Sequence, residues 1–307
     1  MSRHHLVKSH PMLGYFFRPW IISNLYEGLC FLLKHRRWPN FKKTGYINDL
    51  VFRIRAMESD YVFRSFTSDK EFSKIFIRGV TGEDVCVPTL AVLHTAEDVD
   101  QFAFPDNCVI KPTHMSNEFV FHTSGPVPDE ARERMRRWFK MNFADMTGEN
   151  NYKRLQPKII VEPWLELNGQ FAHDFRFHMY NGNVAWIGLR VRVSTDKEIS
   201  YQLTPDWHLK DGPGIETEAA SIDIAALRPK QIARMIDIAE QIARFADYVR
   251  VDFFTDGEDQ LFVGEISHIY AGARKVFKHV ASEQIESRPV RPGEHDTQST
   301  TVTPNEC

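Results

Sequence analysis

Two carboxylates in the C-terminal part of the chain are spaced to meet across a β-hairpin. Residues 248–255 and 261–267 both alternate apolar and polar side chains, as neighbouring strands do, and a polar turn separates them. This pairing predicts that Asp252 lies directly opposite Glu265, where two like charges destabilise a sheet. A hard cation with oxygen ligands, such as Mg²⁺, would resolve the conflict. The pair therefore predicts a magnesium site; the alternative is an edge hairpin whose two acids face water.

A lysine ends an apolar, strand-like run that begins at Cys108. Burying the ammonium group of this residue, Lys111, is costly unless it has a partner. A phosphate group would supply one, and the polar residues that follow, among them His114 and Ser116, could present backbone N–H groups to phosphate oxygens. The alternative is a strand that simply ends in lysine and proline.

Residues 159–166 combine an apolar strand with two acids and a bulky apolar step. An adenosine site needs these parts: backbone groups for the adenine edge, apolar side chains for the ring and a carboxylate for the ribose hydroxyls. The candidate residues are Glu162, Trp164, Leu165 and Glu166.

Arginines recur on the polar side of three predicted strands. Arg176 lies in the alternating run 173–178, Arg190 lies in the next strand-like run, and Arg250 shares a face with Asp252. Arginine binds phosphate and carboxylate groups in a bidentate manner, so these three are candidate catalytic residues. The alternative is a polar sheet face held by salt bridges.

The rest of the chain predicts an α+β protein whose second half is mostly antiparallel strands covered by one long helix. The helix predicted at 68–78 has Phe72, Ile75 and Phe76 on one face. The other predicted helices are 47–55, 95–102, 128–143 and 229–245, and the strands preceding the hairpin are 85–92, 108–111, 157–164, 175–179 and 184–193.

Composition excludes several classes of function. The 307 residues carry a formal net charge of only −3, which argues against nucleic acid as a partner. The sequence has no HExxH spacing, phosphate-binding P-loop, GxSxG or GxGxxG motif. Its four cysteines form no CxxC pair, which favours a reducing compartment, and we expect a cytoplasmic protein.

The N-terminal segment, residues 11–43, is apolar and flanked by basic residues, but charged and polar residues interrupt it too often for a membrane span. Three interpretations stay open: an interfacial helix in peripheral contact with an anionic membrane, a helix packed on the domain, and a simple docking surface.

The order of the motifs resembles that of the TupA-like ATP-grasp proteins of the ATP-grasp superfamily. The motifs are VIKPTH (109–114), EPWL (162–165), DFR (174–176), RVDFF (250–254) and GEIS (264–267). The likeness runs from about residue 45 to about residue 277. It implies an α+β ATP-grasp fold, in which two α+β subdomains clamp ATP and the C-terminal part carries an antiparallel sheet.

The resemblance also implies a division of the chain. We expect a basic and apolar N-terminal segment, an N-terminal α/β region, a lid subdomain, a catalytic subdomain and a disordered tail. Their predicted ranges are 1–44, 45–107, 108–165, 166–281 and 282–307.

Roles follow from the resemblance residue by residue. Lys111 would contact the ATP phosphates, together with the loop that holds His114 and Ser116. The adenine ring would be held by Glu162, Trp164 and Leu165, with Glu166 near the ribose. Asp252 and Glu265 would bind Mg²⁺, Arg250 would steady the transferring phosphate or the tetrahedral intermediate, and Arg176 stands where the family has a lysine.

The implied activity is that of an ATP-dependent carboxylate–amine ligase acting through an acyl phosphate. It would add an amino acid or amine to a cell-surface polysaccharide or peptide precursor. Two departures keep other interpretations open: HMSNE (114–118) replaces a glycine-rich family loop, and Ser267 stands where many ATP-grasp enzymes have a metal-binding asparagine. The alternatives are a non-catalytic nucleotide- or glycan-binding module and an ATP-grasp kinase.

Overall fold

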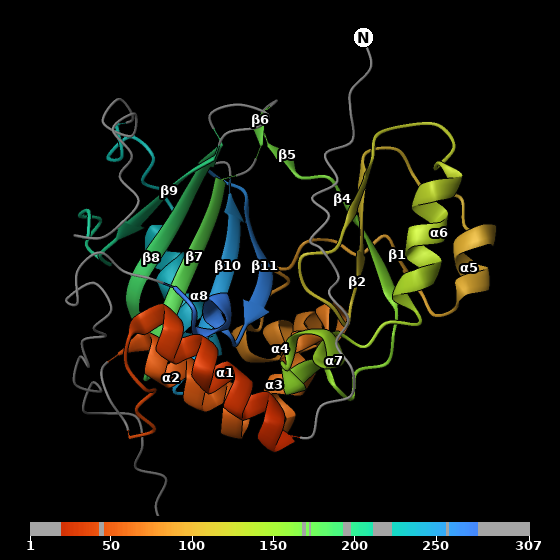
Figure 1. Cartoon of the computed structure of the whole chain (residues 1–307). Coiled ribbons are helices and arrows are strands. Elements are labelled where there is room, and N and C mark those ends of the chain that lie inside the picture. Colours follow the sequence, from red (N-terminus) through yellow and green to blue (C-terminus); the bar gives the residue numbers. More distant parts are fainter. Residues whose placement is uncertain are drawn as a thin grey trace, which may run out of the picture.

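The computed structural model describes residues 20–42, 46–167, 170–171, 173–192, 198–210, 223–255 and 258–275. Within them, a five-stranded and a four-stranded antiparallel sheet lie side by side, with helices below and beside them (Figure 1). The predicted disordered tail lies outside the described residues.

The larger sheet has the strand order β11-β10-β7-β8-β9, and every neighbouring pair is antiparallel. A tight turn joins β7 to β8 at Asn181 and Gly182, whose φ angles of 48° and 77° suit a two-residue hairpin turn. The strands are β7 (His173–Tyr180), β8 (Asn183–Arg192), β9 (Glu198–Leu203), β10 (Tyr248–Thr255) and β11 (Leu261–Ser267).

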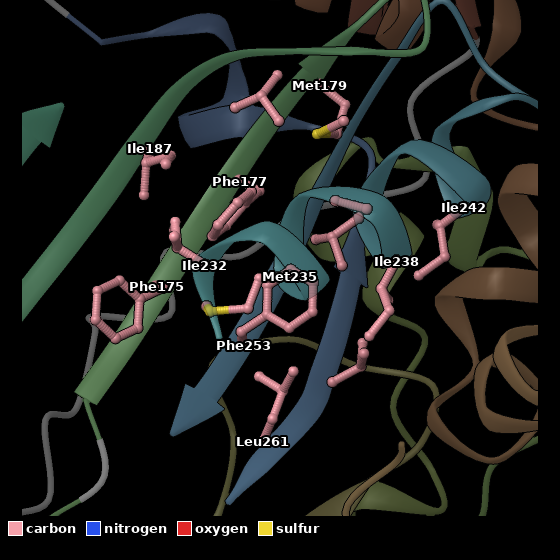
Figure 2. Packing of buried hydrophobic residues seen from close by; sticks show 14 of the residues in the cluster. Phe175, Phe177, Met179, Ile187, Ile232, Met235, Ile238, Ile242, Phe253 and Leu261 are labelled. Carbon is pink, nitrogen blue, oxygen red and sulfur yellow. The ribbon is translucent and has the colours of Figure 1, made fainter. Parts of the chain in front are cut away.

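One face of the larger sheet is apolar and forms the main core. Alternation along β7 and β10 turns Phe175, Phe177 and Phe253 to this face, where all three are fully buried. Helix α8 (Ile232–Ala243) lies across them and inserts Met235 (Figure 2). Because each buried phenylalanine contributes about 1.5–3 kcal/mol, this face fixes the sheet, and the opposite face is free to carry charged residues.

The smaller sheet has the order β1-β4-β2-β3 and is also antiparallel throughout. Figure 1 shows α5 and α6 on its outer side. Its strands are β1 (Ala91–Leu93), β2 (Cys108–Pro112), β3 (Val120–His122) and β4 (Ile159–Pro163). The neighbouring elements are α5 (Ala96–Gln101), α6 (Asp129–Trp138), α7 (Phe143–Thr147), η2 (Asn150–Tyr152) and the short pair β5 (Glu166–Leu167) and β6 (Gln170–Phe171).

The N-terminal helices pack below the larger sheet around a third apolar cluster, in which Phe31 and Ile47 meet Trp186 and Tyr248. Helix α4 begins at Asp69, whose carboxylate accepts hydrogen bonds from the backbone of Glu71 and Phe72. The elements are α1 (Trp20–His35), α2 (Ile47–Arg53), η1 (Ile54–Glu58), α3 (Val62–Ser68), α4 (Lys70–Thr81) and η4 (Tyr270–Ala273).

Most predicted elements are confirmed, including the helix at 95–102, which begins with a capping box at Thr95. The single helix predicted at 128–143 is wrong, because Asn142 caps a new helix, α7, after α6 has ended. The division of the chain into five regions stays a prediction. Strand β1 lies in the predicted N-terminal α/β region, 45–107, but pairs with β4 of the predicted lid subdomain, 108–165.

The strand predicted at 85–92 is wrong for most of its length. The carbonyl of Val85 accepts a hydrogen bond from Val263 in β11, whereas the backbone N–H of Leu90 donates to Val161 in β4. This segment therefore crosses from one sheet to the other. Pro88, which has no N–H, lies between the two contacts.

Helix α4 turns only part of its predicted apolar face inward: Phe76 packs on the main core. Phe72 and Ile75 remain 37% and 55% exposed, whereas Ser73, Lys74 and Ile77 are buried. The buried side of the helix also carries Lys74, whose amino group makes an ion pair with a buried carboxylate.

The C-terminal hairpin has the predicted register: Asp252 lies directly opposite Glu265. The register then shifts, since Phe253 pairs with Val263, so Gly264 is the extra residue of a β-bulge. A Cβ atom added to Gly264 would lie 2.3 Å from the ring of Phe254. Glycine is therefore required for the bulge that carries Glu265.

We expect Gly264→Ala to lower the free energy of unfolding by about 1–3 kcal/mol, because the Phe254 ring must move away from the new methyl group. Gly79→Ala is the matched control. Gly79 is exposed in α4 with open space around it, and alanine there should be neutral or stabilising by up to about 1 kcal/mol. Urea unfolding measures both, and equal midpoints for Gly264→Ala and the wild type would contradict the packing described here.

Candidate functional site

On the face of the larger sheet opposite α8, charged residues lie beside the apolar cluster that contains Trp186 and Tyr248. On β10, Asp252 lies between Arg176 of β7 and Glu265 of β11, and Arg250 lies opposite Ser267. Alternation places all of these side chains on one side of the sheet. We call this surface the polar sheet face.

Arg250 and Asp252 form a bidentate ion pair within β10, with two nitrogen–oxygen distances of 2.6 Å. Arg250 also donates to the Ser267 hydroxyl at 3.2 Å. Burial raises the pKa of Asp252, and the Arg250 guanidinium opposes this shift. Burial by itself would lower the pKa of Arg250. The negative charge of Asp252 has the larger, opposite effect and raises this pKa, so Arg250 stays charged at any ordinary pH.

The three predicted catalytic arginines gather beside Tyr270. Arg176 donates to Asp174 at 2.7 Å and lies 4.0 Å from Asp252. Arg190 lies opposite Asp174 on the neighbouring strand. Burial raises the pKa of the Tyr270 hydroxyl, whereas the positive charges of Arg250, Arg176 and Arg190 act to lower it. Strand pairing places all three arginines on the polar sheet face, and their charges all act on Tyr270.

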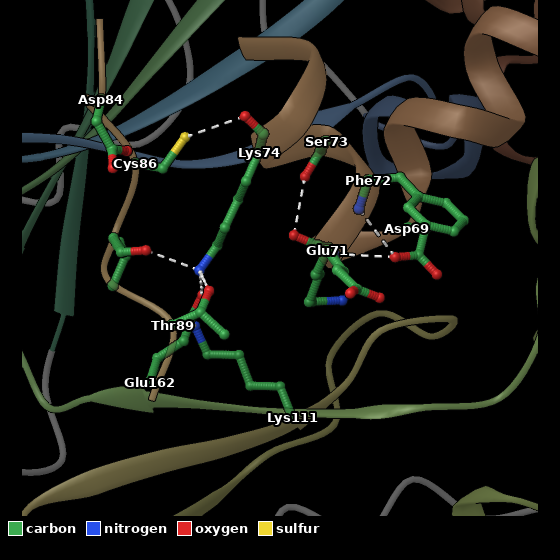
Figure 3. Close-up of polar contacts among 12 residues, drawn as sticks. Asp69, Glu71, Phe72, Ser73, Lys74, Asp84, Cys86, Thr89, Lys111 and Glu162 are labelled. Atoms are coloured by element: carbon green, nitrogen blue, oxygen red, sulfur yellow. Dashed lines mark hydrogen bonds and ion pairs between the residues drawn. The ribbon is translucent and has the colours of Figure 1, made fainter. Parts of the chain in front are cut away.

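On the smaller sheet, one buried carboxylate holds two lysines. The two oxygens of Glu162 lie 2.5 Å from the amino group of Lys74 and 2.7 Å from that of Lys111 (Figure 3). Lys74 also donates to the carbonyl of Val87 and the hydroxyl of Thr89. Burial alone would raise the pKa of Glu162, but the two ammonium groups outweigh it and the pKa is lowered. Lys111 therefore has a partner within the protein, where the sequence suggested only a phosphate.

Lys70, at the start of α4, connects the two sheets electrostatically. Its amino group donates to the carbonyl of Met115. Burial lowers the pKa of Lys70; the charge of Glu265 on the larger sheet raises it, and that of Lys111 on the smaller sheet lowers it further. The charges of Lys111 on the smaller sheet and of Glu265 on the larger sheet therefore both act on the amino group of Lys70.

Lys70 and Lys74 were missed from the sequence. The available signal was two lysines four residues apart, which lie on one face of a helix, directly after the capping residue Asp69. Asp69 also accepts hydrogen bonds from Thr113 and Lys158, which ties the start of α4 to the smaller sheet.

The loop after Lys111 is held by neighbouring side chains. His114 is buried with its Nε2 atom 3.0 Å from the carbonyl of Trp138, and burial lowers its pKa. Its imidazole thus contacts α6. Ser116 is half-buried and hydrogen-bonds to the side chain of Tyr152. Glu118 contacts Arg134 at 2.6 Å and the indole N–H of Trp138, so its negative charge is compensated.

The predicted adenosine-binding segment follows β4. The backbone N–H of Trp164 donates to the carbonyl of Asn107 at 2.8 Å, and its ring centroid lies 4.9 Å from that of Phe121. The next residue, Leu165, is half-buried. Glu166 begins β5, and its side chain lies outside the description.

Asp252 and Glu265 fit a magnesium ion better than most other metals. Both supply hard oxygen donors from directly opposite positions. In the described part of the chain, no three histidine, cysteine or acidic side chains are grouped so as to hold a metal. Mg²⁺ suits such a pair, because it is usually held by one or two carboxylates and completed by water and phosphate oxygens.

A family model described as TupA-like ATPgrasp matches residues 50–284. No curated protein sequence gives a significant match.

Several solved structures are similar. A D-alanine–D-alanine ligase from Bacillus anthracis complexed with ATP is 15% identical, with a TM-score of 0.39 over 68% of this chain and 57% of its own. An L-amino acid ligase from Bacillus licheniformis is 14% identical, with a TM-score of 0.45 over 74% of this chain and 50% of its own. The ATP-grasp ligase PsnB, complexed with a minimal precursor, is 14% identical, with a TM-score of 0.36 over 75% and 61%. The chain thus spans between half and two thirds of their lengths.

We expect Glu162→Gln to lower the free energy of unfolding at pH 7 by about 3–5 kcal/mol, because it leaves the buried Lys74 without its counter-charge. The folded pKa of Glu162 lies below its ordinary 4.5, so its stabilising effect is full above pH 4.5 and is lost as the pH falls through the folded value. The difference between wild type and variant should therefore shrink in acid. Chemical unfolding at several pH values measures it.

The exposed Glu130→Gln is the control, with an expected change under about 1 kcal/mol. A Glu162→Gln variant as stable as this control at pH 7 would show that the two lysines do not depend on the carboxylate.

Proposed function

Because the chain belongs to the TupA-like ATP-grasp family, we propose that it is an ATP-dependent ligase that joins a carboxylate to an amine through an acyl phosphate. One observation carries the proposal: α4 packs on β11, the strand of Glu265, and its Lys74 shares the buried Glu162 with Lys111 of the smaller sheet. A triphosphate between the two sheets would meet lysines on one side and carboxylates on the other.

The nucleotide would lie along the smaller sheet. Lys111 and Lys70 would neutralise phosphate oxygens, as charge-assisted hydrogen bonds do. Trp164 and Leu165 would contact the adenine ring, whose edge would be read by backbone groups of the segment that Glu162 begins, because the Glu162 carboxylate is held by two lysines. Glu166 would accept from the ribose hydroxyls, and Ser116 and His114 stay candidate contributors through the loop that they help to order.

Asp252 and Glu265 would hold Mg²⁺. When bound, the ion supplies positive charge that neutralises the phosphate oxygens as electrons move. Opening this site requires Arg250 to exchange at least part of its bidentate contact with Asp252 for a contact with phosphate, which guanidinium groups bind with the same geometry.

The chemistry would proceed in two balanced steps. An oxygen of the acid substrate attacks the γ-phosphorus, and the bond to ADP breaks. The amine nitrogen then attacks the acyl carbon, phosphate leaves, and the nitrogen loses a proton to give the amide. Arg250 is placed to stabilise the tetrahedral oxyanion, and Arg176 and Arg190 to bind the acidic substrate. Closure of the predicted lid over the acyl phosphate would exclude water.

The substrate class proposed is a small-molecule, glycan or peptide carboxylate with an amino acid or other amine. A cell-surface polysaccharide or peptide precursor is the proposed acceptor, in line with the family that the chain resembles. The density of arginines on the polar sheet face favours acidic substrates such as uronic acids.

We expect the chain, mixed with MgATP and pools of amino acids and uronic acids, to release phosphate and form an amide. Asp252→Asn should lower turnover at least about a hundredfold, since the metal-binding charge is lost. Asp259→Asn is the matched control, because this exposed acid lies in the turn of the same hairpin. Phosphate assay and mass spectrometry report the two products.

Equal turnover by wild type and Asp252→Asn in every pool would reject the ligase. A phosphorylated product without amide would identify a kinase instead.

The non-catalytic module is favoured by one observation, the replacement of the family's glycines by residues 114–118. Calorimetry with ATP distinguishes it. We expect the wild type to bind ATP more tightly with Mg²⁺ present, and Lys111→Met to weaken binding about tenfold to a hundredfold through loss of a charged contact. The exposed Lys153→Met is the control. Tight binding in all conditions with no turnover of any pool would favour the module over the enzyme.

A further inference from the structure

An apolar strip runs along the outer side of α1 and continues past its end. We call it the α1 strip. Leu25, Leu29 and Leu33 recur every four residues, so they lie on one side of the helix, and Leu33 is 81% exposed. The whole strip consists of Leu25, Tyr26, Leu29, Leu33, Trp38 and Phe41, all exposed. Contiguous apolar surfaces of this kind mark sites of interaction.

The strip is a fixed surface, because the opposite side of α1 is anchored. Glu27 and Phe31 are buried there. The carboxylate of Glu27 pairs with Arg55 at 2.7 Å and with Arg274 at 2.5 Å, and His35 lies 3.0 Å from the carbonyl of Ala273. These contacts hold α1 against η1 and the end of η4 and leave the leucines facing outward.

The charge around the strip is of one sign. Lys34, Arg36 and Lys42 are exposed, and the single acid within residues 24–42, Glu27, is buried in its ion pairs. A basic rim around apolar side chains, with a tryptophan among them, is the arrangement of a helix that lies in the interface of an anionic membrane.

We propose that the α1 strip binds the surface of an anionic membrane, with its leucines and Trp38 entering the interface and its basic rim contacting the headgroups. Within the described residues, no helix has both the length and the apolarity needed to cross a bilayer, so the contact proposed is a peripheral one. A second copy of the chain is a poorer occupant. Two-fold pairing through the strip would bring the same cations face to face.

Binding in this way would hold the helix that packs against η4 at the membrane surface. α1 contacts η4 through Ala273 and Arg274, and Tyr270, in the same short helix, lies beside the catalytic arginines. Membrane binding itself does not depend on the ligase activity proposed above.

The test is co-sedimentation of the full chain with vesicles of phosphatidylcholine alone or with 30% phosphatidylglycerol, about 0.3 mole fraction of anionic lipid. We expect sedimentation with the anionic vesicles only. Raising the salt to about 0.5 M should weaken it, because the charges at the interface are then screened.

Two sets of substitutions separate the apolar from the charged contribution. Leu29→Gln with Leu33→Gln should reduce the partition coefficient at least about tenfold. Lys34→Gln, Arg36→Gln and Lys42→Gln together should reduce it on the order of a hundredfold, since each basic residue near an anionic surface contributes about fivefold. The matched controls are Ile75→Gln and the triple variant Lys140→Gln, Lys153→Gln and Arg154→Gln, all exposed elsewhere.

The proposal is supported if the control variants sediment with anionic vesicles as the wild type does, while the leucine variant and the charge variant of the α1 strip stay in the supernatant. The proposal is overturned if the wild type does not bind anionic vesicles or binds neutral vesicles equally well. It is also overturned if the control triple variant loses as much vesicle binding as the triple variant of the α1 strip. It is also overturned if the wild type is a dimer by size exclusion that Leu29→Gln with Leu33→Gln converts to a monomer. If the leucine variant fails to fold, the charge variant alone decides.

Discussion

The carboxylate of Glu162 is the contact on which the arrangement of the two sheets depends. An unpaired charge buried to this extent is costly, and Glu162 is stabilised by Lys74 from α4 and Lys111 from β2. The ion pair therefore fixes α4 against the smaller sheet. The same helix packs on α8 and β11 of the larger sheet. One buried carboxylate thus places Lys70 between the lysine side of the candidate site and Glu265.

The elements that could be predicted from the sequence are those whose pattern is local. The alternation in β7, β10 and β11, the capping box at Thr95 and the tight turn after β7 each depend on residues close together in the chain. The elements that were missed depend on distant partners. Lys74 is buried in α4 because it pairs with Glu162 on a strand far along the chain, and an apolar pattern does not record such a lysine.

The candidate site divides in the same way. The predicted opposition of Asp252 and Glu265 is confirmed, but it depends on the bulge at Gly264. The register nearer the turn pairs Phe253 with Val263 and would bring Gly264 opposite Asp252; the extra residue puts Glu265 there instead. The cluster of arginines follows from strand alternation. The lysines of α4 could not be assigned, since a lysine on a helix is ordinarily a solvated residue. The direction of a loop side chain, toward a ligand or toward a neighbouring helix, depends on tertiary packing and cannot be predicted from the local sequence. His114, which contacts α6, is an example.

The segment that crosses between the sheets limits how far they can separate. Val85 is hydrogen-bonded to β11 and Leu90 to β4, so the two attachments are only five residue steps apart along the chain. Fully extended, five residues span about 17–18 Å. A wider separation of the two sheets would have to break the hydrogen bond at Val85 or the one at Leu90. The amplitude of any opening and closing of this molecule is therefore set by chain length at a single short crossing, independently of what enters between the sheets.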